Sequence, residues 1–167
     1  MTISFRPLVA GDLAQLHEWL EQPHVRRWWR DPSTYDDVVA HYLPSIEGSD
    51  PSDHYVIVVD GRDAGMIETY LVSDYPEYDE LVQVGEGVAG VDLLIGEHDL
   101  IGRGIGTETL RRFADEIVFA RPQTKACVAG VEIENAASLR AFAKAGFEPV
   151  REYEEEGKPH RLLRRER

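Results

Sequence analysis

The chain has 167 residues, 43% of them hydrophobic, and no run approaches the ~20 apolar residues of a membrane span. Its 18 basic and 31 acidic residues give a formal net charge of −13, which argues against nucleic acid, where a basic face is expected. The single cysteine, Cys127, excludes an internal disulfide and a thiolate metal cluster. We expect one globular domain over residues 1–167, with no metal and no membrane partner. The polar N-terminus lacks a secretion signal and favours a cytoplasmic location.

The N-terminal part predicts a short strand at residues 3–8, followed by helices. Asp12 and Gln15 have the spacing of a capping box and would open a helix with its leucines inward. Trp28 and Trp29 then lie in a short helix or turn. At least one of these two rings is expected in the core.

A further helix is expected to begin at a cap formed by Ser33 or Thr34 and to stop at Pro44, before a polar loop at 45–52. Beyond it, β-branched runs and the Asp-Gly hairpin signal at 60–61 predict alternating strands. The six further strands are expected at residues 55–59, 64–72, 88–95, 125–131, 147–153 and 160–163.

The most informative segment is the glycine-rich run LIGRGIGT at residues 100–107, between a strand and a helix at 104–120. Leu110, Phe113 and Ile117 have helical spacing and mark the inward face of that helix. Backbone N–H groups and the helix dipole at such a turn attract phosphate. The run lacks the lysine of a Walker loop and the spacing of a dinucleotide fingerprint. A nucleotide-type cofactor and a plain strand-to-helix turn both remain compatible with it.

Acidic residues gather between Arg62 and Arg103, a stretch that contains ten acids and no Lys or Arg. They form either a solvated acidic surface or a negative cleft that concentrates a polycationic ligand. Residues 73–87 within this stretch are too long for a simple hairpin connection and are expected to be functional.

The order of elements, with a glycine loop after the fourth strand, resembles the Gcn5-related N-acetyltransferase (GNAT) superfamily. Its phosphate loop, Q/R-x-x-G-x-G/A, is matched by residues 101–106, with Ile101 at the leading position. A second signature, N-x-x-A-x-x-x-Y/F-x-K-x-G-F, is matched by Asn135, Ser138 (at the Ala position), Phe142, Lys144, Gly146 and Phe147. The resemblance implies an α/β fold with a mixed central sheet of about seven strands. Strands 4 and 5 would be splayed, and about four to five helices would flank the sheet.

Within the superfamily, the chain resembles the aminoglycoside 6′-N-acetyltransferases of the Ib type over nearly its whole length. The resemblance is carried by Glu18-Trp19-Leu20, His24, Trp28-Trp29, Tyr42-Leu43-Pro44-Ser45, Gly90-Val91-Asp92 and Lys144-Ala145-Gly146-Phe147. Residues 93–96 also resemble the acyltransferases that modify hydroxylysine in siderophore synthesis, which have a His in place of Asp92. The resemblance therefore implies an aminoglycoside acceptor, with a hydroxylysine or other small-amine acceptor as the alternative. A non-catalytic acyl-CoA-binding protein is a third reading.

The resemblance implies acetyl-CoA as cosubstrate, direct transfer to the amine in a ternary complex, and a monomer or homodimer. The pantetheine would pair with the edge of the fourth strand and the pyrophosphate would lie on the glycine loop. The implied cofactor-binding residues are Leu93, Leu94, Ile95, Arg103, Gly104, Ile105, Gly106, Thr107, Asn135 and Lys144. From the residues alone, Asn135 is equally a simple helix cap.

Asp92 lies inside an apolar strand, where Asp is disfavoured, and either has a functional role or is a satisfied structural carboxylate. As the catalytic residue it would anchor the acceptor ammonium and take up its proton. Acceptor-binding residues are expected to be Trp28, Trp29, Glu68, Glu77, Asp79, Glu86, Asp92 and Glu132. Many relatives have a Tyr at the position of Phe142 to protonate the leaving thiolate, and this chain has only a ring there.

Overall fold

The computed structural model describes residues 1–30 and 34–167, so Ser33, one of the two expected caps, lies outside the described residues. Seven strands form one sheet in the order β1-β2-β3-β4-β5-β7-β6. The strands are β1 (Ile3–Pro7), β2 (Asp53–Val59), β3 (Arg62–Leu71), β4 (Val88–Ile95), β5 (Ala126–Glu132), β6 (Glu148–Glu155) and β7 (Lys158–Glu166). All seven strands expected from the sequence are present.

The described residues contain six α-helices, where about four to five were expected. They are α1 (Leu13–Glu21), α2 (Pro23–Arg26), α3 (Tyr35–Glu47), α4 (Pro76–Val82), α5 (Ile105–Phe113) and α6 (Ala136–Lys144). The additional helix is α4, which forms within the acidic segment that the sequence suggested was a long loop. None of the described helices is long and apolar enough to cross a membrane.

The sheet is mixed. β1 pairs antiparallel with β2, and β7 pairs antiparallel with both β5 and β6. β4 and β5 are parallel, with a register that covers only Val88–Gly90 against Ala126–Val128, although β4 has eight residues and β5 has seven. This short register agrees with the predicted splaying of strands 4 and 5.

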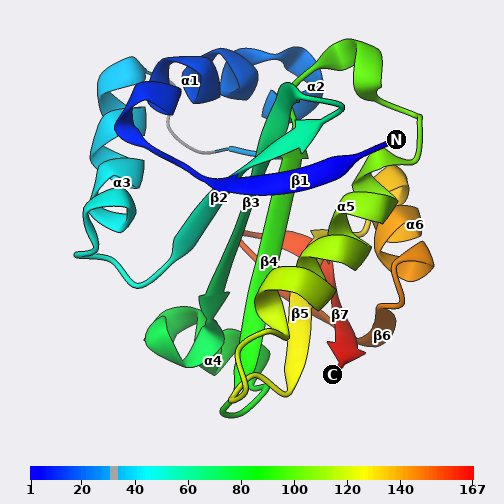
Figure 1. Ribbon diagram of the computed structural model, residues 1–167. Coiled ribbons are helices and arrows are strands. Elements are labelled where there is room, and N and C mark those ends of the chain that lie inside the picture. The colour runs from blue at the N-terminus through cyan, green and yellow to red at the C-terminus, as the bar shows by residue number, and fades with distance from the viewer. Residues whose placement is uncertain (31–33) are drawn as a thin grey trace. The chain divides into compact units, whose positions relative to one another are not determined.

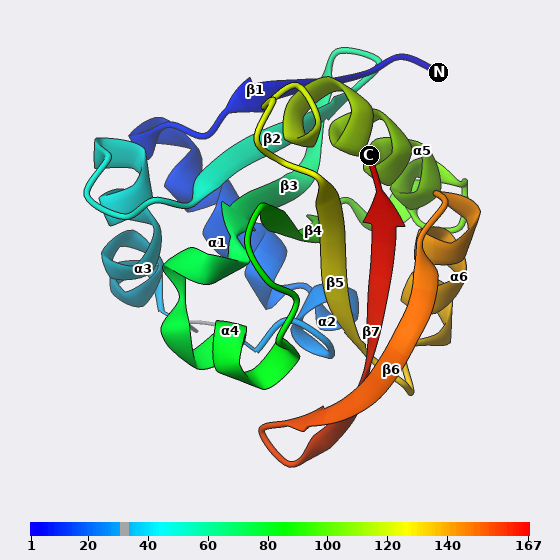
Figure 2. The same ribbon diagram turned by 90° about the horizontal axis from the view of Figure 1, so that it is seen from below.

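The chain divides into two compact units, and β3 and β4 each pass from one to the other. Unit 1 is Met1–Glu68 with Asp92–Ile105, and unit 2 is Thr69–Val91 with Gly106–Arg167. In Figure 1, β1, β2, α1, α2 and α3 of unit 1 carry the blue to cyan colours. Figure 2 shows β5, β7 and β6 of unit 2 side by side, in agreement with the strand order.

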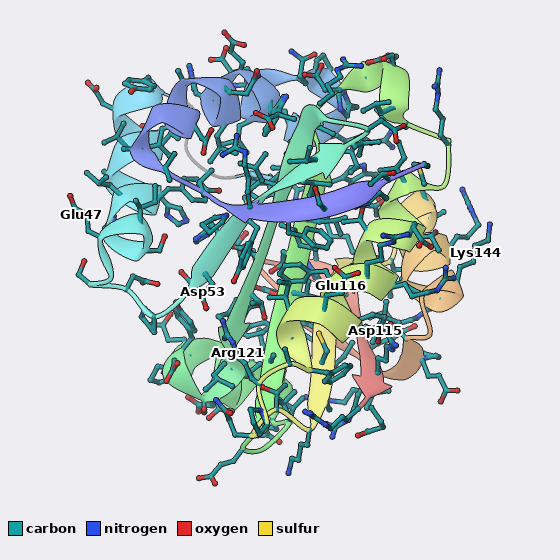
Figure 3. The ribbon with its side chains drawn as sticks, in the orientation of Figure 1. Glu47, Asp53, Asp115, Glu116, Arg121 and Lys144 are labelled. Carbon is teal, nitrogen blue, oxygen red and sulfur yellow. The ribbon has the colours of Figure 1, made fainter. Side chains whose placement is uncertain are left out.

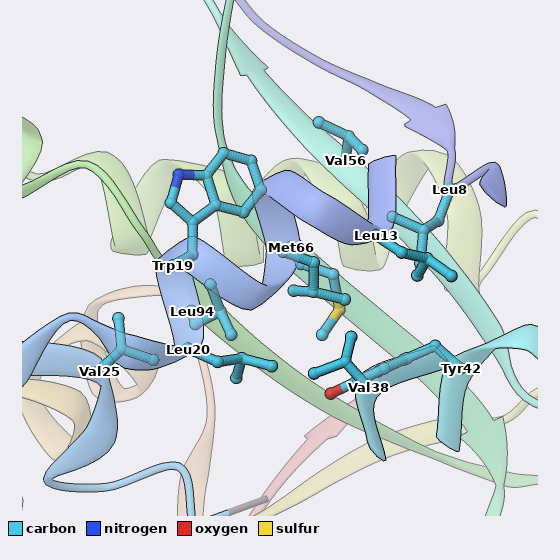
Figure 4. Close-up of a cluster of buried hydrophobic side chains, with 11 residues drawn as sticks. Leu8, Leu13, Trp19, Leu20, Val25, Val38, Tyr42, Val56, Met66 and Leu94 are labelled. Carbon is cyan, nitrogen blue, oxygen red and sulfur yellow. The ribbon is translucent and has the colours of Figure 1, made fainter. Parts of the chain in front are cut away.

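The core of unit 1 lies between its helices and its strands. Leu16 and Trp19 of α1, Tyr42 of α3, Met66 of β3 and Leu94 of β4 belong to one buried cluster (Figure 4). The apolar positions of α1 recur at spacings of three and four, so one face of the helix packs against the strands. Met66 and Leu94 both belong to this cluster. Their side chains therefore lie on the face of β3 and β4 that packs against it.

Unit 2 has its own cluster, built from Val72, Val82, Val88, Ala126, Val128 and Leu162. Cys127 is fully buried and unoxidised, as expected for a core residue. After α5 the helix widens into a π-helical stretch, Ala114–Val118. This extra residue per turn rotates the buried face, so that Val118 is buried and Ile117, the expected inward residue, is only partly buried.

The expected end of α3 is wrong. Pro44 does not stop α3, which continues to Glu47 and ends at Gly48 with a φ of 86°. The helix tolerates Pro44 in its last turn, and Gly48 provides the left-handed residue that ends it. Thr34 is the cap of this helix, since its side chain accepts a hydrogen bond from Asp37 N. Residues 45–47 are thus helical rather than part of a loop.

The predicted capping box of Asp12 with Gln15 does not form. The Asp12 carboxylate instead accepts hydrogen bonds from Val9 N and from both terminal nitrogens of Arg6, each at 2.9 Å. Arg6 also pairs with Asp63 at 2.8 Å and so connects β1, the start of α1 and β3. Burial raises the pKa of Asp12, but the bonds from Arg6 and Val9 outweigh burial and bring this pKa below its ordinary value.

Replacing Asp12 with Asn is expected to lower the free energy of unfolding by about 1 kcal/mol at pH 7. A carboxylate whose pKa is lower in the folded state stabilises the fold above its unfolded pKa, roughly 3.9. That contribution is lost as the pH falls through the lower, folded pKa. The difference between Asp12→Asn and wild type in urea denaturation should therefore shrink below about pH 4. Asp74→Asn, at an exposed position, is the control, and a difference that grows in acid contradicts this account.

Candidate functional site

The last four residues of β4, which belong to unit 1, place Asp92 beside a tightly constrained strand end. Asp92 is partly buried and comes two residues before the buried Leu94. The carbonyl of Ile95 lies 2.8 Å from Nε2 of His24, at the start of α2. Of the expected cofactor strand, Leu93 and Ile95 are partly buried and Leu94 is part of the core. One carbonyl at this strand end thus already has a partner within the chain.

Glycines at two positions allow this strand end to approach its neighbours. A Cβ on Gly65 of β3 would collide with the backbone carbonyl of Leu94, and a Cβ on Gly96 would collide with the ring of Trp19. Trp19 is 2% exposed, and its Nε1 donates to Glu97 at 3.3 Å. The ring therefore cannot move aside, and β4 is held at a fixed distance from β3 and α1.

The glycine loop that follows is exposed. Gly102 and Gly104 both have a φ of +75°, and nothing lies within 4 Å of a Cβ on either. Side chains rarely adopt this backbone conformation, so the loop needs glycine for its shape rather than to avoid a contact within the chain. The chain then enters α5, whose first N–H groups have no partner within the helix. An exposed loop before a helix N-terminus is chemically suited to phosphate.

Arg103 is exposed and makes no hydrogen bond or close ion pair with any residue in the described ranges. Its charge assists Arg62, the larger cause, in lowering the pKa of Asp99. By contrast, Arg111 and Arg112 on α5 both pair with Glu108. Of these three arginines, Arg103 is thus the one whose guanidinium is not engaged in a salt bridge of this kind.

Several acids of the expected negative stretch are neutralised within unit 1. Asp99 and Glu97 pair with Arg62 at 2.8 and 3.2 Å, and Asp63 pairs with Arg6. Glu68, an expected acceptor residue, lies 2.6 Å from Nε2 of His54. Three of these four carboxylates are therefore in ion pairs with arginines, and these three contribute less to a negative field than their number in the sequence suggested.

The two tryptophans have different surroundings. Trp29 packs against the core cluster of unit 1, and its Nε1 is buried. The guanidinium of Arg27 lies 4.7 Å from the ring centroid of Trp28. The core role expected for one of the pair is thus confirmed for Trp29. One face of Trp28 already holds a cation from the chain itself.

In unit 2, the second signature forms the start and end of α6. Asn135 caps this helix, with Oδ1 accepting from Ser138 N at 3.2 Å, as its structural reading predicted. Lys144 is exposed at the other end (Figure 3). Its carbonyl accepts from Arg111 at 3.0 Å. Phe142 is only 3% exposed and packs edge-on against Phe147, with ring centroids 5.0 Å apart.

The other expected acceptor residues are also in unit 2. Glu77 is exposed and Asp79 is partly buried, and both lie in the first turn of α4, where carboxylates stabilise the helix dipole. Glu86 is exposed in the loop before β4. Glu132 on β5 is 11% exposed and lies 3.9 Å from Lys158 of β7. Glu77 and Asp79 therefore have an evident structural role as well, at the start of α4.

Unit 1 also contains a groove of about 430 Å³ that the sequence did not indicate. It is lined by Gln15, Glu18, Trp19, Gln22, Gly96, Glu97, His98 and Asp99. None of the expected site residues lines it. Within the described part of the chain, no three His, Cys, Asp or Glu side chains gather as a metal ion would require.

The arrangement agrees with known proteins. The family model for the acetyltransferase (GNAT) domain matches residues 9–154. The chain belongs to the GNAT acetyltransferase family. It is 28% identical, over 88% of its length and 74% of the relative's, to the aminoglycoside N(6′)-acetyltransferase type 1 of Klebsiella pneumoniae.

Solved structures show the same similarity. The aminoglycoside acetyltransferase AAC(6′)-Ib in complex with coenzyme A and kanamycin has a TM-score of 0.90 and 27% identity, covering 99% of this chain and 95% of that one. AAC(6′)-Ib with paromomycin and acetyl-CoA has a TM-score of 0.89 and 26% identity, covering 100% of this chain and 94% of that one. The expected GNAT fold is thus confirmed over the whole chain.

Replacing Gly96 with Ala is expected to lower the free energy of unfolding by about 3 kcal/mol or more, because the buried Trp19 ring has no room for a Cβ. Gly11→Ala is the matched control, since nothing lies within 4 Å of a Cβ there. Thermal unfolding of both variants measures the difference. Equal melting temperatures would show that β4 is not held against α1 in this way.

Proposed function

We propose that this protein is an acetyl-CoA-dependent N-acetyltransferase that acts on the 6′-amine of aminoglycosides. The observation that carries the proposal is the whole-chain similarity to AAC(6′)-Ib with coenzyme A and kanamycin, at a TM-score of 0.90 and 27% identity. The exposed glycine loop and the partly buried Asp92 of β4 support it, because they have the chemistry that the two substrates require.

The donor side uses the glycine loop. The N–H groups at the start of α5 and the guanidinium of Arg103 would bind the pyrophosphate of acetyl-CoA, with residues 104–107 surrounding it. Leu93 and Ile95 would pair with the pantetheine through their backbone. Asn135 and Lys144 of α6 would assist in binding the cosubstrate. A side chain on Gly104 would have to adopt a strained backbone and would stand where the phosphates approach.

The acceptor side uses Asp92. An amine that is protonated at pH 7 cannot attack a thioester, so a carboxylate must hold the ammonium and remove its proton. Asp92 would do both, directly or through a water. The neutral nitrogen then forms a bond to the thioester carbonyl carbon and gives up its second proton to water, the carbon–sulfur bond breaks, and the coenzyme A thiolate leaves. Strand N–H groups would stabilise the oxyanion between these two steps.

Other carboxylates would bind the remaining ammonium groups of a polycationic acceptor. We assign Glu68 to this role, together with Glu77, Asp79, Glu86 and Glu132, and Trp28 and Trp29 as ring-contacting residues. The ring of Phe142 is buried and has no proton to give. A thiolate is a fair leaving group by itself, and it would take its proton from water or from another tyrosine.

Asp92→Asn is expected to lower kcat/KM for kanamycin and tobramycin by roughly 100-fold or more, because the amide cannot accept the proton. Release of coenzyme A from acetyl-CoA measures the reaction, and Asp74→Asn is the exposed control. N-hydroxylysine is tested beside the aminoglycosides. Turnover with hydroxylysine alone, or no turnover, overturns the proposed acceptor class.

Gly104→Ala is expected to raise the KM for acetyl-CoA roughly 10-fold, with a smaller effect on the KM for the aminoglycoside. Gly157 is the matched control, because it has the same φ of +75° and equally open surroundings, in the β6–β7 turn. Gly157→Ala carries the same backbone strain and should leave the KM for acetyl-CoA unchanged. If both variants raise it equally, the loop does not bind the cosubstrate.

A further inference from the structure

We propose that His54 is a positioning residue that holds the Glu68 carboxylate in the orientation needed to bind the acceptor. This inference rests on the proposed function and deepens it. The sequence indicates no role for His54 or Ser45. In the structure His54 contacts the expected acceptor residue Glu68, and Ser45 contacts His54.

Three residues from three elements of unit 1 form a buried polar chain. Oγ of Ser45 on α3 lies 2.9 Å from Nδ1 of His54 on β2. Nε2 of His54 lies 2.6 Å from Oε2 of Glu68 on β3. The His54 side chain is only 4% exposed and the Glu68 side chain 18%, so water screens this pair weakly.

The donors available decide the hydrogen bond at Nδ1. The hydroxyl of Ser45 donates its only proton to the carbonyl of Tyr42, at 2.8 Å. Nδ1 of His54 is then the donor to Ser45 Oγ. On the other side of the ring, Nε2 is buried and lies 2.6 Å from Oε2 of Glu68, a contact that is an ion pair when the imidazole is protonated.

The ring of His54 packs against the hydrophobic core. The aromatic ring of Tyr42 meets it edge-on, with centroids 5.0 Å apart, and Tyr42 is fully buried in the core cluster. The backbone of His54 is held separately, because the N–H of Leu8 donates to the His54 carbonyl at 2.9 Å. The hydrophobic core thus contributes to the position of the imidazole beside Glu68.

Glu68 is placed beside Asp92 by the strands of unit 1. Gly96 N donates to Ala64 O at 2.8 Å, and Met66 and Leu94 share the core cluster, so β3 and β4 run antiparallel here. Glu68 follows Met66 by two residues on β3, and Asp92 precedes Leu94 by two residues on β4. Both carboxylates therefore lie at the same end of this strand pair.

Only one oxygen of Glu68 is engaged. Oε2 faces His54, and no residue in the described ranges contacts Oε1 at hydrogen-bond distance. Fixing Oε2 leaves Oε1 as an acceptor of known direction at the Asp92 end of the strands. An oriented carboxylate binds an ammonium or hydroxyl with less loss of side-chain freedom than a mobile one.

Two substitutions of His54 separate positioning from simple burial. Gln places its amide near the position of Nε2 and keeps a donor toward Glu68, whereas Asn places its amide near Nδ1 and loses it. We expect His54→Asn to weaken tobramycin binding and raise the tobramycin KM roughly 10-fold, with the KM for acetyl-CoA unchanged. We expect His54→Gln to recover most of this loss. His17→Asn, in the more exposed His17–Glu21 pair on α1, is the control, since the His17 side chain is 21% exposed.

The double variant tests whether His54 acts through Glu68. If it does, His54→Asn should add no further loss in a Glu68→Gln background. Three results would each overturn the positioning role. The first is an equal loss of tobramycin binding in His54→Asn and His54→Gln, and the second is additive losses in the double variant. The third is a parallel rise in the KM for acetyl-CoA.

Calorimetry measures the binding constant of tobramycin in the presence of coenzyme A. This measurement distinguishes a failure of this inference from a failure of the proposed function. A wild-type protein that binds tobramycin without acetylating it overturns the proposed function, and the ratio of binding constants then decides the role of His54. A wild-type protein that neither binds nor acetylates tobramycin overturns both. Melting temperatures of all variants confirm that the folded proteins are being compared.

Discussion

The close approach of β4 to β3 and to α1 is the constraint on which the rest of unit 1 depends. It is possible only because Gly65 and Gly96 have no side chain where the Leu94 carbonyl and the Trp19 ring lie. The buried tryptophan sets the position of the strand end, and the contact of His24 with the Ile95 carbonyl holds it from another helix. Asp92 is therefore presented by a strand that cannot shift, which a residue handling a proton at a precise distance requires.

Charge in this protein is distributed more locally than its total suggests. The net charge of −13 is large, yet Arg6 and Arg62 each hold two carboxylates of unit 1 in ion pairs. Such partly exposed pairs contribute modest stability individually, and they remove these carboxylates from any role in binding a free cation. The other acids between Arg62 and Arg103 have no ion pair with these two arginines, so the orientation of each one matters as well as the overall field.

Much of the fold could be predicted from the sequence because local patterns decide it. Alternation and β-branched runs located all seven strands, and the two signatures identified the family. The errors arose where tertiary contacts override local rules. Asp12 occupies the N-cap position of α1 but makes no side-chain bond to this helix, because its carboxylate accepts instead from Arg6, a residue of another element, and from Val9 N. Pro44 ends no helix because it lies in a last turn that Gly48 completes.

The rotation of the buried face from Ile117 to Val118 has a similar origin. A π-helical stretch adds a residue to the turn, and no periodicity in the sequence predicts where that residue is inserted. The residues of the candidate site could likewise be predicted from the sequence only where a local pattern marks them. Gly104, Asp92 and Asn135 carry local signals, whereas His54 lies fourteen positions before Glu68 in the sequence and has none.

The Ser45–His54–Glu68 chain shows why a composition-based view of the acceptor face is incomplete. Counted as an acid, Glu68 adds one negative charge to the stretch between Arg62 and Arg103. In the structure its Oε2 lies 2.6 Å from Nε2 of a buried imidazole, so the carboxylate has a fixed neighbour that a count of charges does not reveal. In the proposed function, an acceptor group that meets Glu68 is recognised by the direction of this carboxylate as well as by its charge. The proposed roles then differ between the two carboxylates: Glu68 would orient the acceptor, and Asp92 would take the proton of its amine.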